Sequence, residues 1–370
     1  MSEKYRKLLD ACMAKVDYML GELHGFPHAT KGGEWLQNQN GHWTGGFWTG
    51  LLWIKAILSD DPLDRETAKA WAMKLRCRMT DDMTHDLGFI FGPSCVFGYR
   101  LTADPDFLPL IHAGSDNLRR QYVPQSGLIR AWGESGYEGI SIVDTIMNLP
   151  IIWISCEMTG DKEGQEFALA VARRIRQYAV RSDYSTFHVV KWDRDFHISG
   201  GTHQGYSDTS CWSRGQAWAL YGFANMYRYT GQREFLDTAV NTAEYFWNHL
   251  NDDHLPAWDF VFRNQNAPID ASAASVAASG MELLASILRK EGESGAADMW
   301  EERVDVILDA LADKCLYRQL DRYGIIEKVT IDLPRNSGIG ESSMYGDYYF
   351  AEALYRKYFR DHAKMLDLLY

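Results

Sequence analysis

The chain has 370 residues, of which 46% are hydrophobic and 24% charged, and its formal net charge is −12. A chain of this length can bury a large core without disulfides or bound metal ions. The acidic balance, without clustered Lys and Arg, argues against a surface for nucleic acid or for an anionic membrane. An anionic ligand would therefore have to be held by local cations. The 13 Trp, 20 Tyr and 16 Phe exceed what a core of this size requires.

The first twenty residues predict an amphipathic helix rather than a signal peptide, because Asp10, Lys15 and Asp17 interrupt the apolar run that a signal peptide needs. No stretch reaches the roughly 18 apolar residues of a membrane span. The six cysteines are scattered without a CxxC pair, which suggests neither a zinc site nor a disulfide framework. We therefore expect a soluble, cytoplasmic protein with reduced thiols.

Two kinds of helical segment alternate along the chain, and the clearest strand pattern is FHVVKW near residue 190. Segments with one charged face span roughly 2–23, 62–79, 104–121, 161–181, 232–250 and 293–315. Segments that are apolar on nearly all sides begin at Thr44, His85, Ile142, Ser213, Ile269 and Tyr345. A helix that is apolar all round must be buried, whereas a helix with a charged face lies outside.

This strict alternation predicts an all-α fold, an (α/α)6 barrel in which six inner helices are wrapped by six outer helices. Residues 1–370 would then form a single domain. An α-solenoid is the alternative, but its repeats would be shorter, more regular and less aromatic on the inner face. In the barrel, the loops that enter the inner helices all open on one rim.

Polar residues gather in these rim loops. They are His42, Trp43 and Thr44; His85 and Asp86; Asp144; the GGTHQG segment of residues 200–205; Arg214 and Gln216; Asp270; and Gly346 with Asp347. Convergence of polar groups on one aromatic-lined mouth predicts a binding site there.

Two aspartates are the strongest candidates for chemistry. Asp144 stands between apolar residues in SIVDTIMNLP, where an unpaired carboxylate would be costly. Asp86 in THDLGF has the same setting one helical hairpin earlier, and for both residues the alternative role is a helix N-cap. We expect the two carboxyl groups to face each other across the cavity. Two neighbouring carboxyls, one of them desolvated, can split their pKa values so that one stays protonated near neutrality.

Other rim residues are candidates for binding. His203, with Gln204 in the glycine-cushioned loop, either contacts a ligand or is satisfied by backbone groups. Arg214 offers a planar fork for a ligand carboxylate, and the alternative is a structural ion pair with a rim aspartate. Trp43, Trp48, Trp132, Trp212 and Trp218 lie at or near the rim, where indole rings either stack on sugars or fill the barrel.

Eight motifs in order resemble those of the unsaturated glucuronyl hydrolases of glycoside hydrolase family 88, and they cover most of the chain. They are FPHAT (26–30), HWTGGFWTGLLW (42–53), HDLGF (85–89), IRAWG (129–133), IVDTIMNLP (142–150), GGTHQG (200–205), WSRGQAWALYGF (212–223) and YGDYYFAEAL (345–354). Each motif alone is weak, whereas together they are highly specific.

The resemblance implies an (α/α)6 barrel that hydrates the 4,5-unsaturated uronic acid of lyase-generated oligosaccharides of the glycosaminoglycan type. It makes Asp144 the general acid and base and Asp86 its essential partner. It also assigns substrate contacts to Trp43, Trp132, His203, Trp212, Arg214, Gln216 and Trp218. The implied chemistry requires neither a metal nor an organic cofactor. Sulfate recognition in the family involves the loop before YGDYY, where this chain has Arg335 but Glu341 rather than a lysine, so no dedicated sulfate site is predicted.

Three other functions remain open at this point. An unsaturated rhamnogalacturonyl hydrolase would share the barrel and the chemistry but act on pectin fragments; GGTHQG and RGQAW favour the glucuronyl type. A sugar epimerase would rely on paired catalytic histidines, and His203 alone is well placed. A non-catalytic sugar-binding barrel would keep the tryptophans but has no use for two buried rim aspartates.

Overall fold

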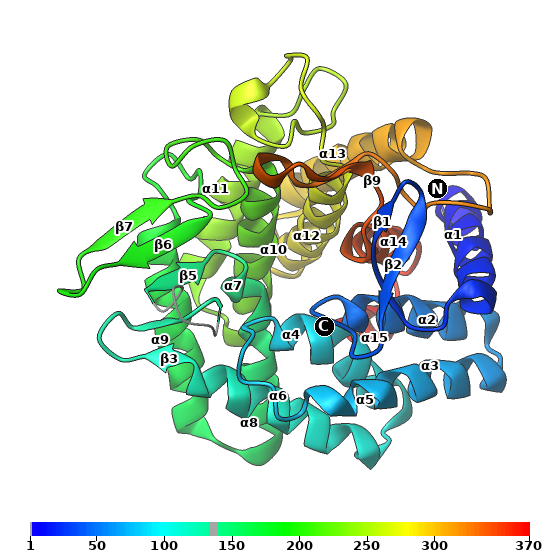
Figure 1. Cartoon of the computed structure of the whole chain (residues 1–370), viewed down its shortest axis with the longest axis horizontal. Coiled ribbons are helices and arrows are strands. Elements are labelled where there is room, and N and C mark those ends of the chain that lie inside the picture. The colour runs from blue at the N-terminus through cyan, green and yellow to red at the C-terminus, as the bar shows by residue number, and fades with distance from the viewer. Residues whose placement is uncertain (1, 133–138) are drawn as a thin grey trace.

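The computed structural model describes residues 2–132 and 139–370. Gly133, the last residue of the IRAWG motif, lies outside the described residues. Figure 1 shows the chain as a helical barrel, with α12 and α14 inside and α1 and α13 at the periphery.

The inner ring is built from the segments that the sequence shows as nearly uncharged. It consists of α2 (Gly45–Ser59), α4 (Leu87–Phe91) and α5 (Phe97–Thr102) with a π-helical turn between them (Gly92–Val96), α7 (Thr145–Asn148) and α8 (Pro150–Thr159), α10 (Ser213–Thr230), α12 (Ala271–Lys290) and α14 (Met344–Tyr358). Neighbouring members pack on each other, and α14 packs on α2. The ring is therefore closed, which an α-solenoid would not be.

The outer ring is built from the segments with a charged face. It consists of α1 (Ser2–Glu22), α3 (Pro62–Lys74), α6 (Leu108–Arg120), α9 (Lys162–Ala179), α11 (Arg233–Asn248) and α13 (Ser294–Lys314), and a short α15 (Ala363–Leu366) follows near the C-terminus. Each outer helix packs on its inner neighbour in the sequence, as α13 does on α12 and α11 on α10. The (α/α)6 barrel expected from the alternation is confirmed.

Small residues let the inner helices approach closely. A Cβ atom added to Gly46 of α2 would lie 2.0 Å from the backbone oxygen of Phe89 in α4, so this crossing requires glycine. Helix α12 is long and apolar enough to cross a membrane, but 94% of its apolar window is buried inside the protein. Its composition is that of a barrel core helix.

The loops between the helices form short antiparallel sheets. The paired strands are β1 (Phe26–Lys31) with β2 (Glu34–Asn38), β3 (Tyr122–Val123) with β4 (Leu128–Ile129), β5 (Ile140–Ile142) with β6 (Val189–Trp192) and β7 (Ile198–Gly201), and β8 (Val329–Asp332) with β9 (Ser337–Glu341). The FHVVKW prediction corresponds to β6. Figure 1 shows β6 and β7 extending as a hairpin from the barrel. The other strands are too short for a period of two residues to be recognised in the sequence.

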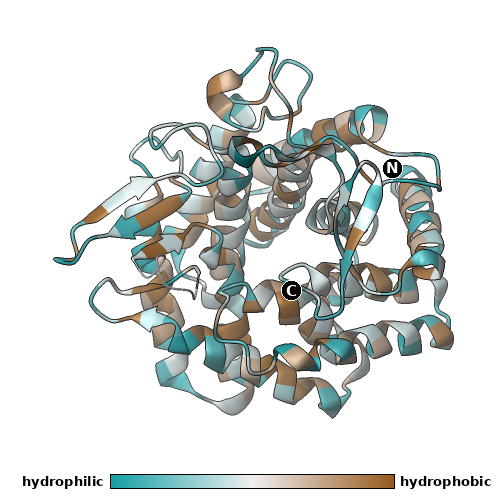
Figure 2. Cartoon of the chain, viewed as in Figure 1, coloured by the Kyte–Doolittle hydropathy of each residue, from teal (hydrophilic) through white to brown (hydrophobic). Residues whose placement is uncertain are grey.

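One continuous apolar cluster reaches from Tyr5 in α1 to Tyr370 at the end of the chain. Figure 2 shows hydrophilic residues gathered in the loops and on outer helix faces, around this apolar interior. The single domain over residues 1–370 stays a prediction, with which the continuous cluster agrees.

Candidate active site

A cavity of about 430 Å³ opens at the rim, where β-strand loops meet the starts of the inner helices. Seven of the rim residues predicted from the sequence line it: His42, Trp43, His85, Asp86, Trp132, Asp144 and Gln204. This volume lies within the roughly 300–1,000 Å³ that is typical of small-ligand sites. The cavity is therefore the candidate active site.

The two aspartates occupy N-cap positions, yet neither side chain caps its helix. Asp144 precedes α7 and Asp86 precedes α4, and neither carboxylate accepts a capping hydrogen bond. By contrast, Asp161 caps α9 and Asp270 caps α12. Asp144 has φ −60° and ψ −22°, already helical, whereas a capping residue normally adopts an extended backbone. The N-cap role left open by the sequence is wrong for both residues.

The Asp144 carboxyl is held in its neutral form. Its Oδ1 atom is enclosed without a hydrogen-bond partner among the described residues. Burial, and after it the negative charge of Asp86, raise the pKa of Asp144 to about 8 against the opposing positive charge of Arg214. A carboxyl with this pKa carries a proton at neutral pH and can donate it to a ligand in the cavity.

The Asp86 carboxylate lies in a more polar setting. Its Oδ2 accepts a hydrogen bond of 2.9 Å from the Thr84 hydroxyl, and His85 Nε2 lies 3.3 Å from its Oδ1. His85 is itself oriented, because its Nδ1 donates to the backbone oxygen of Ala131 at 2.7 Å. The two carboxyls therefore line the same cavity in different environments, and that they face each other across it stays a prediction.

Arg214 is not available as a fork for a ligand carboxylate, and this corrects the substrate contact expected for it. It is 2% exposed and forms an ion pair with Asp270. Its Nη1 also donates to the backbone oxygen of Thr330 at 2.8 Å, and its Nη2 to that of Ile331 at 2.6 Å. Arg214 thus anchors the segment that brings Ile331 to the cavity lining. Its positive charge also lowers the pKa of Asp144, against the effect of burial.

Three further residues expected to contact substrate lie in the interior instead. Gln216 is fully buried, and its amide donates to the backbone oxygens of Tyr184 and Thr242. The amide therefore links two segments of the protein and is not directed to a ligand. Trp218 is 1% exposed and packs against Phe89 in the barrel core. Trp212 is 3% exposed and packs against the ring of His188, with 4.4 Å between the ring centroids. It is not part of the cavity lining.

His203 lies beside the cavity rather than in its lining. Its ring packs against Trp132 with centroids 4.9 Å apart, and its Nδ1 lies 3.1 Å from Arg335 Nη2, which can donate to it. Its neighbour Gln204 does line the cavity, and the Gln204 amide is fixed by donating to the backbone oxygen of Ile331.

His188 holds the GGTHQG loop beside the cavity, a supporting role that sequence reasoning missed. Its Nδ1 accepts the backbone N–H groups of His203 and Gln204, each at 3.2 Å, so the neutral ring carries its proton on Nε2. Burial holds the pKa of His188 well below its usual value, and its Nε2 has no hydrogen-bond partner among the described residues. The available signal was an imidazole in FHVVKW, just before GGTHQG. His28, Arg78 and Thr84 also line the cavity and were not predicted.

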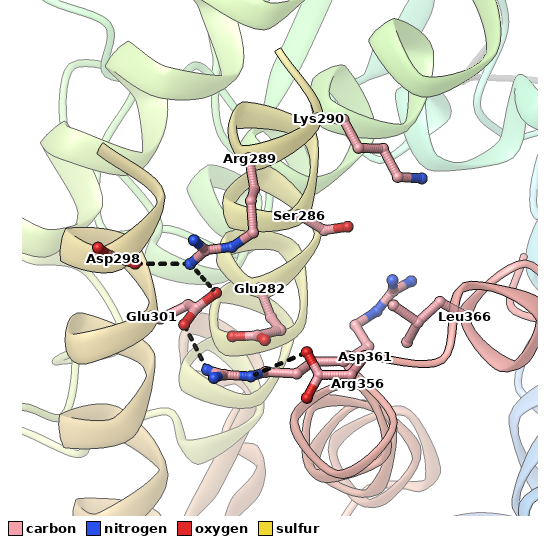
Figure 3. Close-up of a pocket in the computed structure, with 10 residues that line it drawn as sticks. Glu282, Ser286, Arg289, Lys290, Asp298, Glu301, Arg356, Asp361 and Leu366 are labelled. Atoms are coloured by element: carbon pink, nitrogen blue, oxygen red, sulfur yellow. Dashed lines mark hydrogen bonds and ion pairs between the residues drawn. The ribbon is translucent and has the colours of Figure 1, made fainter. Parts of the chain in front are cut away.

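A second cavity, of about 360 Å³, lies at the other end of α12 (Figure 3). Arg289 forms ion pairs there with Asp298 and Glu301, and Arg360 pairs with Glu301. Because α12 has 20 residues, this network is about 30 Å from the rim end of the helix. None of the sequence-predicted site residues lines this second cavity, so its ion pairs are assigned to helix packing.

The buried Arg214–Asp270 pair leads to a prediction on stability. Replacement of Arg214 by Met leaves Asp270 buried without its counter-charge, which is expected to cost about 3–5 kcal/mol of unfolding free energy. The double change Arg214→Met with Asp270→Asn should recover part of this loss, because Asn keeps the cap of α12. Urea denaturation measures both. The exposed pair Arg233–Asp237 is the matched control, and Arg233→Met should cost less than about 1 kcal/mol. Equal losses for the two arginines would contradict the structural role.

The model of Glycosyl Hydrolase Family 88 matches residues 22–257. The unsaturated glucuronyl hydrolase of Bacillus sp. (strain GL1) is 32% identical over 343 residues, covering 90% of each chain. The unsaturated chondroitin disaccharide hydrolase of Streptococcus agalactiae serotype III (strain NEM316) is 30% identical over 368 residues, covering 97% of this chain and 91% of that one. The crystal structure of an unsaturated glucuronyl hydrolase specific for heparin superposes with a TM-score of 0.90 at 28% identity, over 100% of both chains.

Proposed function

The chain belongs to glycosyl hydrolase family 88, and we propose that its rim cavity performs the reaction through Asp144 and Asp86. The protein is a glycoside hydrolase of the unsaturated glucuronyl type. It acts on oligosaccharides whose non-reducing end is a 4,5-unsaturated uronic acid, the sugar that a polysaccharide lyase leaves behind. The reaction adds water to the C4=C5 bond and does not displace a group at the anomeric carbon.

The first step needs an acid. The C4=C5 bond is part of a vinyl ether, so a proton added to C4 leaves a cation at C5 that the ring oxygen stabilises. Asp144 supplies this proton, since its pKa of about 8 keeps the carboxyl neutral at pH 7. The enclosed Asp144 Oδ1, which has no hydrogen-bond partner among the described residues although Asp144 lines the cavity, is the observation that supports the mechanism most strongly.

The second step needs a base. Once it has given up its proton, the Asp144 carboxylate accepts one from the water that attacks C5, and the acid is restored. The hydrated product is a hemiketal at C5, which opens to a ketone and releases the neighbouring sugar from C1. Asp86 supplies the negative charge that favours the protonated form of Asp144 before each turnover. The carboxylate-spacing rule for ordinary glycosidases does not apply, because no displacement occurs at C1.

We further propose that the preferred substrates are glycosaminoglycan fragments without sulfate. Relatives are named for chondroitin and heparin substrates, which supports the class. In the loop before α14, Arg335 is already paired with Asp332, and Glu341 accepts the backbone N–H groups of Gly32 and Gly33. A sulfate in that loop would meet a carboxylate and an arginine whose charge is already balanced.

The proposed function is tested by mixing the purified protein with unsaturated disaccharides from chondroitin, heparin and pectin. The conjugated double bond absorbs in the ultraviolet, so its loss follows hydration directly. We expect loss of absorbance with the glycosaminoglycan disaccharides, faster for unsulfated than for sulfated forms. Consumption of the pectin disaccharide alone would favour the rhamnogalacturonyl type, and persistence of every unsaturated uronide would disprove the proposal.

A further inference from the structure

His42 lines the cavity but plays no part in the two proton transfers. Its side chain is exposed, whereas Asp144 lies deeper, with its Oδ1 enclosed. Neither ring nitrogen of His42 is hydrogen bonded to a residue in the described part of the chain, because its contacts there are the ring of His28 and the nearby charges of Asp86 and Arg78. The imidazole therefore presents both nitrogens at the mouth of the catalytic cavity.

The backbone of His42 is held in a conformation that few residues adopt. Its φ is +45°, in the left-handed region, where a non-glycine residue marks either a turn or a functional position. Its N–H donates to Asn40 Oδ1 at 3.0 Å, and its carbonyl oxygen accepts from Arg78 Nη1. Arg78 is in turn fixed by its Nε, which donates to Asp81 at 2.8 Å. These contacts fix the backbone from which the imidazole projects.

The ring itself is also supported. It packs against the imidazole of His28, with centroids 4.7 Å apart, and His28 Nδ1 lies 3.0 Å from the hydroxyl of Thr44. The neighbours that enclose part of the His42 ring withdraw water from it and lower its pKa, and burial lowers the pKa of His28 to about 4. Both imidazoles are therefore neutral at pH 7, and a neutral imidazole offers one hydrogen-bond donor and one acceptor.

The geometry of the substrate indicates which part of it lies near the His42 imidazole. The uronic acid must place C4 and C5 against Asp144, and it carries the rest of the oligosaccharide on C1. The leaving sugar must therefore extend from Asp144 toward the open mouth. Three other polar side chains of the cavity lining already donate hydrogen bonds within the protein: Arg78 to Asp81, Thr84 to Asp86, and Gln204 to the backbone oxygen of Ile331.

We propose that His42 recognises the leaving sugar, hydrogen bonding its hydroxyl groups through the ring nitrogens that it presents to the cavity. This inference rests on the proposed function and extends it to the sugar that is released. His42 would then be a specificity-determining residue, and Arg78 its positioning residue. Because the contact forms with the bound substrate and persists in the transition state, its loss should weaken binding more than turnover.

Two substrates that share the unsaturated glucuronic acid test this proposal. One is an unsulfated chondroitin disaccharide, and the other is the methyl glycoside, whose leaving group has no sugar hydroxyls. His42→Ala is expected to raise KM for the disaccharide about 3–10-fold, the range of a lost hydrogen bond, with kcat nearly unchanged. For the methyl glycoside both constants should stay within about twofold of wild type. His42→Gln, which keeps a donor and an acceptor, should restore part of the disaccharide KM.

His24 supplies the control, because it is exposed on the same N-terminal segment and does not line the cavity. His24→Ala should leave both substrates unchanged. Equal effects of His42→Ala on the two substrates, or no effect on either, would overturn the role in leaving-sugar recognition. Failure of the wild-type protein to consume either substrate would instead overturn the proposed function. Thermal unfolding of His42→Gln shows whether a loss of folding accounts for any change.

Discussion

Asp144→Asn is expected to lower kcat by about 10⁴-fold, at the upper end of the range for loss of a general acid or base. The effect should be large because one carboxyl both protonates C4 and accepts a proton from water, and an amide does neither. Asn has nearly the shape of Asp, so the cavity and the fold should persist. Initial rates of double-bond loss and the thermal unfolding midpoint measure the two properties separately.

The stability of the same variant should depend on pH in a defined direction. In the folded protein the pKa of Asp144 is raised from 3.8 to about 8, so the folded state binds a proton that the unfolded state has released. Wild-type stability from this group therefore falls as pH rises from about 4 to about 8. Asp144→Asn lacks this loss and should gain stability relative to wild type over that interval.

A matched aspartate outside the cavity controls for the substitution itself. Asp161 caps α9 and pairs with Arg119. Because Asn also caps a helix, Asp161→Asn loses only the partly exposed ion pair, so it should cost less than about 1 kcal/mol of stability and leave kcat nearly unchanged. If Asp144→Asn retained activity comparable to Asp161→Asn, Asp144 would not be the acid and base.

Asp86→Asn is expected to lower activity by about 10²-fold or more and to shift its pH dependence. The negative charge of Asp86 is the second cause of the raised pKa of Asp144, after burial. Removal of that charge should lower the pKa of Asp144, so the residual activity should decline at a lower pH than in the wild type. Rates measured across pH for the variant and the wild type reveal the shift.

Thr84→Val separates the charge of Asp86 from its orientation. It removes the 2.9 Å hydrogen bond to Asp86 but keeps the negative charge. The rate should therefore fall less than in Asp86→Asn, with the alkaline decline in activity near its wild-type pH. An alkaline decline that is identical in Asp86→Asn and wild type would contradict the electrostatic role of Asp86.

The barrel could be predicted from the sequence because burial on all sides and burial on one side leave different charge patterns. The segment 271–290 carries almost no charge over its first turns, whereas 162–179 carries charge along one face. Such patterns identify inner and outer helices without any knowledge of side-chain contacts. The rim followed from the barrel topology, and it brought Asp86, Asp144, Trp43 and Trp132 to one cavity.

The direction of side chains inside the barrel could not be predicted in the same way. An inner helix has no polar face, so its sequence does not reveal which residues point into the cavity and which into the core. Gln216 and Trp218 follow Arg214 by two and four positions, yet all three point to interior partners. Whether Asp144 caps α7 depends on backbone angles that its neighbours do not determine.

His28 and His188 were missed for a related reason. Each belongs to a segment whose local pattern was extended or loop-like. His28 lines the cavity, and His188 supports the neighbouring GGTHQG loop, only because hairpins far apart in the chain fold over the same rim. His188, for example, reaches the GGTHQG loop by pairing of β6 with β7. Such contacts depend on strand register, which short strands specify weakly.

The most direct test of the acid role of Asp144 is the pH dependence of kcat/KM on an unsaturated glucuronyl disaccharide. A neutral Asp144 with a pKa of about 8 predicts that kcat/KM is sustained at neutral pH and falls as the pH passes about 8. An activity that continues to rise above that pH, or that is lost as the pH passes the ordinary carboxyl pKa of about 4, would contradict it.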